Sequence, residues 1–168
     1  RSAHPESPDA RILAIATEHI RRNGHKRTTV VAIAESAGMS HANVYRHFPS
    51  KQALVEAVSE NWLRPVEALI RDIGDGPDPA YDKLERFATT VYSAYRDKLD
   101  HDPNIFAIFA QATENGTILA RRHRSRLQAE CQRVVEEGIA SGAFPFAEQR
   151  RALAVIFDTL FRFLHPVA

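Results

Sequence analysis

The sequence predicts an all-α protein in which an N-terminal helix-turn-helix domain of three helices precedes a larger C-terminal helical domain. Three observations support this fold class. Apolar residues recur at intervals of three and four over most of the chain, which is the spacing of one face of an α-helix. No segment alternates apolar and polar residues in the way of a half-buried strand. Capping and turn residues divide the 168 residues into about eight helical segments.

Three helices are expected near the N-terminus, each preceded by a hydroxyl side chain that suits an N-cap position. They span about residues 8–23, 30–37 and 41–48. A short turn that contains Gly38 joins the second helix to the third. The expected caps are Ser7, the pair Thr28-Thr29 and Ser40, and the expected inward residues are Ile12, Leu13, Ala16, Ile20, Val30, Ile33, Ala34, Ala37, Val44 and Phe48.

Five further helices are expected after the cap Ser50. The first of these contains Pro65, which removes a backbone hydrogen bond and predicts a kink. Its apolar residues at helical spacing are Leu54, Val58, Trp62, Val66, Leu69 and Ile73. A linker is expected at residues 74–79, and the other helices at about residues 80–99, 103–113, 117–140 and 147–164. The inner stripe of the helix at 117–140 comprises Leu127, Cys131, Val134, Val135 and Ile139.

The distribution of charge points to a polyanionic partner at the N-terminal end. Residues 1–51 hold eight basic and four acidic side chains and five histidines, whereas residues 52–168 hold 14 basic and 17 acidic ones. The single cysteine excludes a disulfide framework and a cysteine-rich zinc site. Because no apolar run approaches the length of a membrane span, we expect a soluble, cytoplasmic protein without membrane contact.

The second and third helices, with their short turn, form a helix-turn-helix candidate, which places a helix in the DNA major groove. The outward face of the third helix carries His41, Asn43, Tyr45, Arg46 and His47. A merely solvated face normally includes Glu or Asp, and this face has neither. Lys51 follows in the first turn of the next helix, where a cation opposes the helix dipole unless a phosphate is bound there. These residues predict a DNA-binding surface.

From Ile12 to about Leu63 the sequence resembles the DNA-binding domain of the TetR (tetracycline repressor-like) family. The resemblance covers about a third of the chain, and its motif elements keep their spacing together. The matching elements are Ile12-Leu13 and the alanine that follows, Gly24 before Thr28-Thr29, Ile33-Ala34, Ala37-Gly38-Met39-Ser40, Val44-Tyr45, His47-Phe48-Pro49-Ser50-Lys51 and Leu54. The resemblance implies a helix-turn-helix domain in residues 1–50 and a ligand-binding and dimerisation domain in residues 51–168, with the helix that begins at residue 51 shared between them.

The resemblance also implies roles for individual residues. Phosphate-contacting positions are matched by Thr29, Ser40, Tyr45, His47 and Lys51, base-reading positions by His41, Ala42 and Arg46, and Asn43 suits either role. Two residues depart from the family pattern. Val31 stands where members often have a polar or basic residue, so the second helix is expected to read bases less. His19 stands on an inward face, and its ring nitrogen is expected to bond a neighbouring backbone carbonyl.

Aromatic residues concentrate in the helices expected at 80–99 and 103–113, facing the helix that begins at residue 51. Rings with a few polar tips suit a mainly apolar ligand pocket, although ordinary core packing explains any single residue better. The resemblance implies a pocket in this domain. The candidate lining residues are Trp62, Val66, Phe87, Val91, Tyr92, Tyr95, Phe106 and Phe109.

The helix expected at residues 147–164 is apolar on nearly every side, whereas a surface helix shows one apolar stripe. We expect one face to pack on the body and the other on a second subunit. The expected dimer contacts along one side are Phe157, Phe161 and Leu164.

Two other features have simpler explanations than a binding site. The basic run Arg121–Arg126 fits a solvated helix start better than a site for an anionic effector or a second DNA contact. Cys131 fits a small buried apolar residue. No metal-ligand spacing, nucleophile elbow, P-loop or dinucleotide fingerprint occurs in the sequence, so we expect no metal, no cofactor and no enzymatic activity.

These observations predict a ligand-responsive transcriptional regulator, most simply a homodimeric repressor that a small, mainly apolar effector releases from a palindromic double-stranded operator. Two alternatives stay open. One is a helical ligand-binding or protein-interaction module whose helix-turn-helix does not read DNA. The other is an architectural DNA binder that takes no ligand, and an apolar cavity in the larger domain would count against it.

Overall fold

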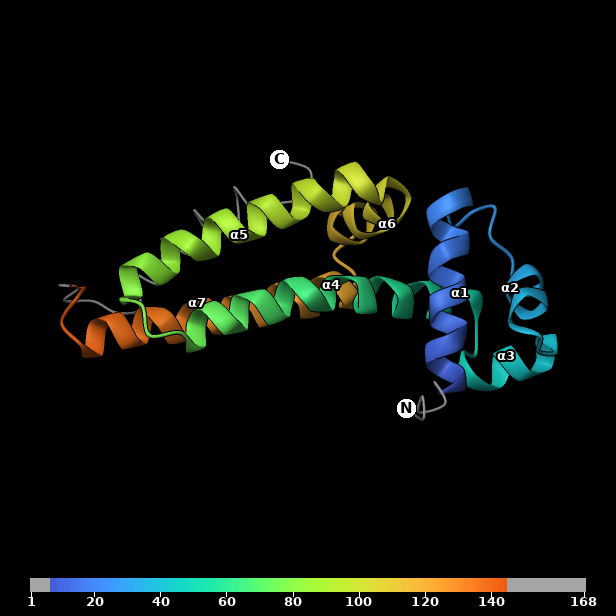
Figure 1. The fold of residues 1–168 in the computed structure, drawn as a ribbon, viewed down its shortest axis with the longest axis horizontal. Coiled ribbons are helices and arrows are strands. Elements are labelled where there is room, and N and C mark those ends of the chain that lie inside the picture. Colours follow the sequence, from blue (N-terminus) through green and yellow to red (C-terminus); the bar gives the residue numbers. More distant parts are fainter. Residues whose placement is uncertain (1–6, 145–168) are drawn as a thin grey trace, which may run out of the picture. The chain divides into compact units, whose positions relative to one another are not determined.

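The computed structural model describes residues 7–144, and the regular structure within this range is entirely α-helical (Figure 1). The predicted all-α fold is confirmed. The helices are α1 (Pro8–Asn23), α2 (Val30–Ala37), α3 (His41–His47), α4 (Lys51–Asp75), α5 (Ala80–His101), α6 (Pro103–Glu114) and α7 (Ile118–Ala140). The helix expected at residues 147–164, with Phe157, Phe161 and Leu164, lies outside the described residues.

Local capping determines where the first three helices begin. The hydroxyl oxygens of Ser7, Thr29 and Ser40 accept hydrogen bonds from backbone N–H groups three residues ahead, at 3.1–3.2 Å. Each bond satisfies a donor that the helix itself leaves unpaired. Between α2 and α3, Gly38 adopts the left-handed conformation, with φ of 64°, which a residue without a Cβ atom adopts at little cost.

The chain forms two compact units. Within the described residues, the first comprises residues 7–62 and Asp102–Phe109, and the second comprises Leu63–His101 and residues 110–144. α4 and α6 each contribute to both units. The predicted division at residue 50 concerns function and stays a prediction, whereas the packing divides the chain inside α4.

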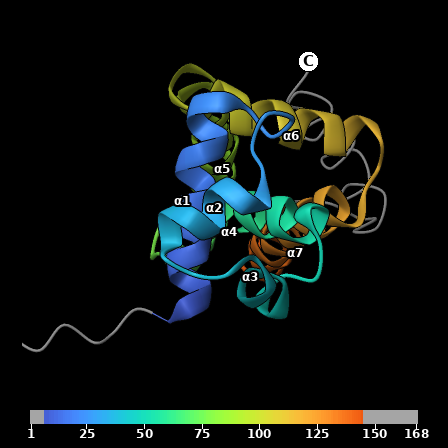
Figure 2. The same ribbon diagram turned by 90° about the vertical axis from the view of Figure 1, so that its right-hand side faces the viewer.

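The first unit is built on α1, α2 and α3, which pack on one another (Figure 2). Its buried apolar residues include Ile12, Ala16, Ile20, Val30, Ile33, Ala34, Ala37 and Val44, together with Leu54 and Val58 of α4. The predicted inward face is confirmed at these positions, while Leu13 and Phe48 are half-buried.

The first two turns of α6 join the first unit through polar contacts. The Asp102 carboxylate accepts a hydrogen bond from Trp62 Nε1 at 2.9 Å and also contacts the guanidinium of Arg21. The side-chain amide of Asn104 donates to the backbone oxygen of Arg21 at 2.9 Å. This bond satisfies a carbonyl in the last turn of α1, which has no partner inside its own helix. Residues about 80 positions apart in sequence therefore complete the first unit.

In the second unit, α5 packs against α7, and ion pairs connect α7 to the second half of α4. The charges alternate along this seam, as Glu67–Arg126 at 3.0 Å, Arg71–Glu130 at 3.9 Å and Asp75–Arg133 at 2.8 Å. A shift of one helical turn would bring like charges together, so the alternation favours a single register. The apolar core beneath includes Val66, Ile70, Ile73, Phe87, Val91, Leu127, Cys131, Val134 and Val135.

The linker expected at residues 74–79 begins later than predicted, because α4 continues through Pro65 and Gly74 to Asp75. The backbone oxygen of Gly74 accepts a hydrogen bond from Lys83 Nζ at 3.0 Å. A Cβ atom on Gly74 would lie 2.6 Å from Arg133 Nη2. Gly74 therefore lies inside the helix and next to the flexible end of a long side chain, and it does not mark the end of the helix.

Two predicted inward residues of the second unit are less buried than expected. Leu69 is 49% exposed, because the buried face of this part of α4 is centred on Val66, Ile70 and Ile73. Ile139, near the end of α7, is half-buried.

Gly138 of α7 marks a close approach to α5 and supplies a test of this packing. A Cβ atom there would lie 2.9 Å from the Cβ of Ala80 and would overlap the ring of Phe144. Overpacking costs about 1–3 kcal/mol, and the gain of about 1 kcal/mol in helix propensity offsets only part of it. We expect Gly138→Ala to lower the midpoint of thermal unfolding measured by circular dichroism. Gly74→Ala is the matched control, since its Cβ meets mainly the flexible end of an arginine, and equal midpoints for the two variants would contradict the packing.

Candidate nucleic-acid interface and effector domain

α3 is a short helix oriented by one buried side chain. Val44 is fully buried in the first unit, and Ser40 caps the helix start. Because successive residues are about 100° apart around a helix, burying Val44 turns the opposite face outward. Ala42 and Arg46 lie on that face, Tyr45 lies beside it and His41 lies in the first turn, and all four are exposed. These four side chains are thus available to a partner.

The remaining predicted DNA contacts lie on α3 or at neighbouring helix ends. Thr29 and Ser40 are exposed, while Asn43, His47 and Lys51 are half-buried. The oxygens of the Thr29 and Ser40 hydroxyls accept the capping bonds, which leaves the hydroxyl hydrogens to donate to a phosphate. All nine predicted residues fall in the first unit, and their DNA contacts stay predictions.

Two rings on the outward face of α3 are in contact. The rings of His41 and Tyr45 meet edge to face, with centroids 4.6 Å apart and an interplanar angle of 89°. Each ring restricts the other before any ligand arrives. On α2, Val31 is 51% exposed, so an apolar side chain stands where family members often have a polar one.

Positive charge collects near the start of α4. The pKa of His25 lies below its ordinary value of 6.5, first because the ring is partly buried and then because Lys26 and Lys51 are close to it. Neutral His25 leaves the two lysines as the charged groups at neutral pH. A phosphate near Lys51 would relieve the repulsion among these side chains.

Two histidines of the first unit have side-chain partners. Nε2 of His19 lies 2.9 Å from the hydroxyl oxygen of Ser36, so the expected bond to a backbone carbonyl is wrong. A hydroxyl on α2, across the α1–α2 interface, takes that place. Nδ1 of His47 contacts the carboxylate of Asp9 in the first turn of α1.

The predicted effector residues are divided between the two units. Trp62, Phe106 and Phe109 belong to the first, where their rings meet edge to face with centroids 6.3–6.4 Å apart. The Trp62 indole N–H donates to Asp102. These three rings contact one another, and the indole N–H, which is the one hydrogen-bonding group among them, already has an acceptor.

The other five predicted effector residues belong to the second unit. Val66, Phe87, Val91 and Tyr95 are buried there, and Val66 also lines the groove described below. Tyr92 is 54% exposed, and the guanidinium of Arg96 lies 6.0 Å from its ring centroid. The structure therefore does not bring Tyr92 together with the other four.

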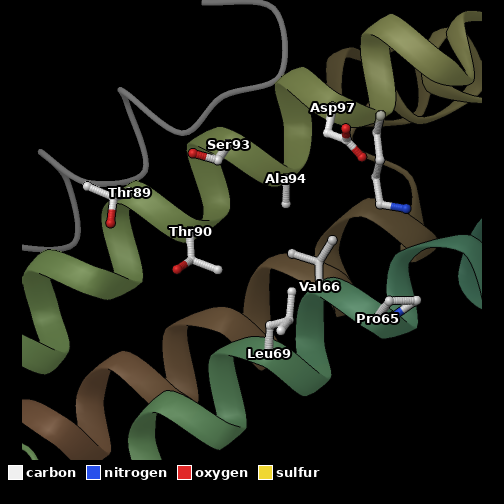
Figure 3. A pocket seen from close by; sticks show the side chains of 9 residues that line it. Pro65, Val66, Leu69, Thr89, Thr90, Ser93, Ala94 and Asp97 are labelled. Atoms are coloured by element: carbon white, nitrogen blue, oxygen red, sulfur yellow. The ribbon is translucent and has the colours of Figure 1, made fainter.

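A groove of about 640 Å³ lies between α4 and α5 in the second unit (Figure 3). α4 supplies an apolar wall, and α5 supplies a wall of small and hydroxyl-bearing side chains with a charged end. The lining residues are Pro65, Val66 and Leu69 from α4 and Thr89, Thr90, Ser93, Ala94, Asp97 and Lys98 from α5. In sequence, the α5 wall of the groove was detectable only as two rows of residues spaced by four positions, Thr89-Ser93-Asp97 and Thr90-Ala94-Lys98.

Within residues 7–144, no group of three His, Cys, Asp or Glu side chains is placed to hold a metal ion. None of the helices in this range combines the length and apolar character needed to cross a membrane. Cys131 is fully buried, and burial raises the pKa of its thiol to about 12.

Sequence comparison identifies the protein family. The family model of the bacterial regulatory proteins of the tetR family matches residues 12–58, and the model of the tetracyclin repressor-like C-terminal domain matches residues 80–168. The chain belongs to the TetR family. It is therefore a transcriptional regulator by family, and both of its units contribute to the match.

Two curated relatives cover most of this TetR-family protein. The HTH-type transcriptional repressor KstR2 of Rhodococcus jostii is 28% identical over 162 residues, which are 94% of this chain and 74% of the relative. KstR2 of Mycolicibacterium smegmatis is 26% identical over 147 residues, which are 84% and 70%.

Solved structures of other TetR-family proteins share the fold. A regulator of the TetR/AcrR family from Thermobifida fusca gives a TM-score of 0.69 at 20% identity, covering 92% of this chain and 83% of the other. FadR from Bacillus subtilis, in complex with stearoyl-CoA, gives a TM-score of 0.64 at 21% identity, covering 92% and 84%.

The second unit of this TetR-family regulator contains a buried polar network. Nδ1 of His123 lies 2.7 Å from the Glu67 carboxylate, and its Nε2 lies 2.9 Å from the Tyr95 hydroxyl. Arg126 donates to both oxygens of Glu67, at 3.2 and 3.0 Å. The prediction of a solvated start for α7 holds for the exposed arginines of the basic run, but His123 is only 3% exposed and is an exception. The network connects α4, α5 and α7.

The charge of Glu67 depends on its two donors. Burial raises the pKa of Glu67, but hydrogen bonds and charge interactions with His123 and Arg126 outweigh burial and bring the pKa below its ordinary value of 4.5. The same surroundings, through burial and the nearby Glu67 charge, raise the pKa of the Tyr95 hydroxyl, which stays neutral. The unit thus holds a carboxylate ionised in its interior.

Replacing Glu67 tests this network. Because the folded-state pKa is lowered, the stabilisation is present above pH 4.5 and is lost as the pH falls through the folded-state pKa. We expect Glu67→Gln to reduce the free energy of unfolding at pH 7 by about 1–3 kcal/mol, measured by urea denaturation. The deficit should shrink below pH 4.5. Glu136→Gln, at an exposed position that bonds Gln132 one turn away, is the control and should change little; a pH-independent deficit would assign Glu67 a role in packing alone.

Proposed function

We propose that this protein is a homodimeric repressor that binds a palindromic operator through α3 and leaves it when a small, mainly apolar effector binds. The outward face of α3 carries this proposal, because it holds polar and basic side chains and no carboxylate. Two such helices in successive major grooves require a separation of about 34–36 Å, and a two-fold dimer supplies that arrangement. Since the target is chromosomal DNA, we place the protein in the cytoplasm.

The residues of α3 and its neighbours divide into two roles. Thr29, Ser40, Tyr45, His47 and Lys51 would hold phosphates, which fixes the register on the duplex without reading sequence. His41, Ala42 and Arg46 would contact base edges, and Asn43 suits either role. Arg46 is the strongest candidate for direct readout, because an arginine donates two parallel hydrogen bonds to the edge of a guanine.

The groove between α4 and α5 is the proposed effector site. Its apolar wall supplies buried area, and the hydroxyls of Thr89, Thr90 and Ser93 orient one or two oxygen atoms of a ligand. Proteins of similar fold have been solved with ligands that contain an apolar part, FadR with stearoyl-CoA, which has a long acyl chain, and RolR with resorcinol, a ring with two hydroxyl groups. The trio of Trp62, Phe106 and Phe109 is a weaker candidate, because its rings already contact one another.

Release from the operator requires an effector that binds two states of the dimer with different affinities. α4 contributes to both compact units, and Pro65, which lacks a backbone N–H group, lies three residues beyond Trp62 at the division between them. We propose that a change in α4 on ligand binding alters the separation of the two α3 helices. A coupling of about 1–3 kcal/mol between the two sites is typical of such devices.

Operator binding and base reading are tested by one pair of variants. Lys51→Ala should weaken binding to all duplexes alike and lower the slope of log K against log salt by about 1 per half-site. Arg46→Ala should relax the preference at one operator position, at a cost of about 1–3 kcal/mol there. The measurements are selection from random DNA and fluorescence anisotropy over a salt series. A wild-type protein that selects no consensus would refute the proposal and favour a module that does not read DNA.

The effector site is tested by a thermal-shift screen of small compounds with an apolar body and one or two oxygen groups. A ligand that binds only the folded state stabilises it by about 2.7 kcal/mol at a hundredfold excess over Kd. For compounds that also release the operator, we expect Leu69→Glu to abolish the shift, because it places a charge in the apolar wall. Tyr92→Ala lies outside the groove and should keep the shift. Loss in Tyr92→Ala but not in Leu69→Glu would place the site on the exposed side of α5 around Tyr92, outside the groove.

A further inference from the structure

An acidic side chain lies next to the proposed DNA-binding surface, where a negative charge opposes the approach of phosphates. Asp9, in the first turn of α1, contacts Nδ1 of His47, the last residue of α3. The His47 side chain is 27% exposed, and that of Asp9 is 60% exposed. Because His47 is a proposed phosphate contact, its acidic neighbour calls for an explanation.

Stability alone does not account for the contact between Asp9 and His47. An ion pair with so exposed a partner contributes about 0–1 kcal/mol. The start of α1 is already capped by Ser7, whose hydroxyl oxygen accepts the N–H of Ala10 at 3.2 Å. The helix dipole favours the negative charge of Asp9, since this residue lies in the first turn of α1. The carboxylate is therefore suited to hold the ring in one orientation.

The chemistry of the ring determines what that orientation allows. A histidine donates from both ring nitrogens only when it is protonated. With the Nδ1 proton directed at Asp9, Nε2 is the nitrogen available to a second partner. Within residues 7–144 the ring contacts no second ionised group. A DNA phosphate at Nε2 would place the imidazole between two anions, and this arrangement favours a proton on each nitrogen.

We propose that Asp9 positions His47 for an operator phosphate, and that operator binding takes up one proton at His47 in each half-site. The proton comes from solvent and forms the Nε2–H bond, which then donates to the phosphate oxygen, while Nδ1–H keeps donating to Asp9. The inference rests on the proposed function, because it requires an operator bound through α3. Asp9 is thus a positioning residue that touches no DNA.

Other charged residues near α3 also influence how readily His47 binds this proton. The charged residues on α3 and the neighbouring helices within the first unit, besides Asp9, are Arg11, Glu18, Arg21 and Arg22 in α1, Glu35 in α2, Arg46 in α3, and Lys51, Glu56 and Glu60 in α4. Of these and Asp9, only Asp9 is in contact with the ring in the described part of the chain. The first unit also contains His19, His25 and His41, so the contribution of His47 has to be isolated by a double-mutant cycle.

The experiment measures binding to a duplex that the wild-type protein itself selects from random DNA. Fluorescence anisotropy at constant ionic strength, from pH 6 to pH 8, compares wild type with D9N, H47Q and the double variant. Asn keeps an acceptor for Nδ1 but removes the charge, and Gln keeps a donor that does not titrate. Glu35→Gln is the matched control, because it removes one exposed acidic charge from the same unit without touching His47.

Uptake of one proton steepens the affinity by up to about tenfold per pH unit. We expect the ratio of affinities at pH 6 and pH 8 to fall at least about threefold in D9N and in H47Q, with no further fall in the double variant. Glu35→Gln should keep the wild-type ratio. If D9N behaves like Glu35→Gln, binding as well or better with an unchanged ratio, the inference is wrong while the proposed function stands. If the wild type selects no duplex, the proposed function fails first.

Discussion

The burial of Val44 is the constraint on which the DNA-binding surface depends. α3 has seven residues, which is too short to be stable by itself, so its position comes from its cap and from the one side chain that it buries. Once Val44 is inside, helical geometry directs Ala42 and Arg46 outward, and His41 and Tyr45 are exposed beside them. The edge-to-face contact of His41 with Tyr45 and the contact of His47 with Asp9 then restrict rotation of side chains on a helix whose backbone is already fixed.

The second unit is organised by a buried charge instead of a buried apolar side chain. Glu67 lies in the interior because His123 and Arg126, both on α7, supply hydrogen bonds to it. His123 then reaches Tyr95 on α5, so one carboxylate on α4 determines how three helices meet. Leaving any of these groups unpaired would cost the full desolvation of a polar group, which penalises alternative arrangements. The alternating ion pairs along α4 and α7 act in the same direction.

The aromatic trio of the first unit and the groove of the second unit differ in how their side chains fill space. Large rings concentrated in helices suggest a cavity only if they fail to fill the space among themselves. Trp62, Phe106 and Phe109 do fill it, with the indole N–H bonded to Asp102. The groove is lined instead by small residues of α5, whose short side chains leave space opposite Val66 and Leu69. Small side chains on a packed helix were therefore a better indication of an accessible site than aromatic ones.

The sequence by itself determined the helices, the helix-turn-helix and the outward face of α3, because these depend on periodicity, caps and turns within a few residues of one another. It misplaced the end of α4, because Gly74 suggests a break when only its neighbours in sequence are considered. Asp102 with Trp62 and Arg21, His123 with Glu67 and Tyr95, and Asp9 with His47 were decided by the tertiary structure. These partners lie about 30 to 80 positions apart. The sequence around a polar residue does not indicate which distant group will form a hydrogen bond with it.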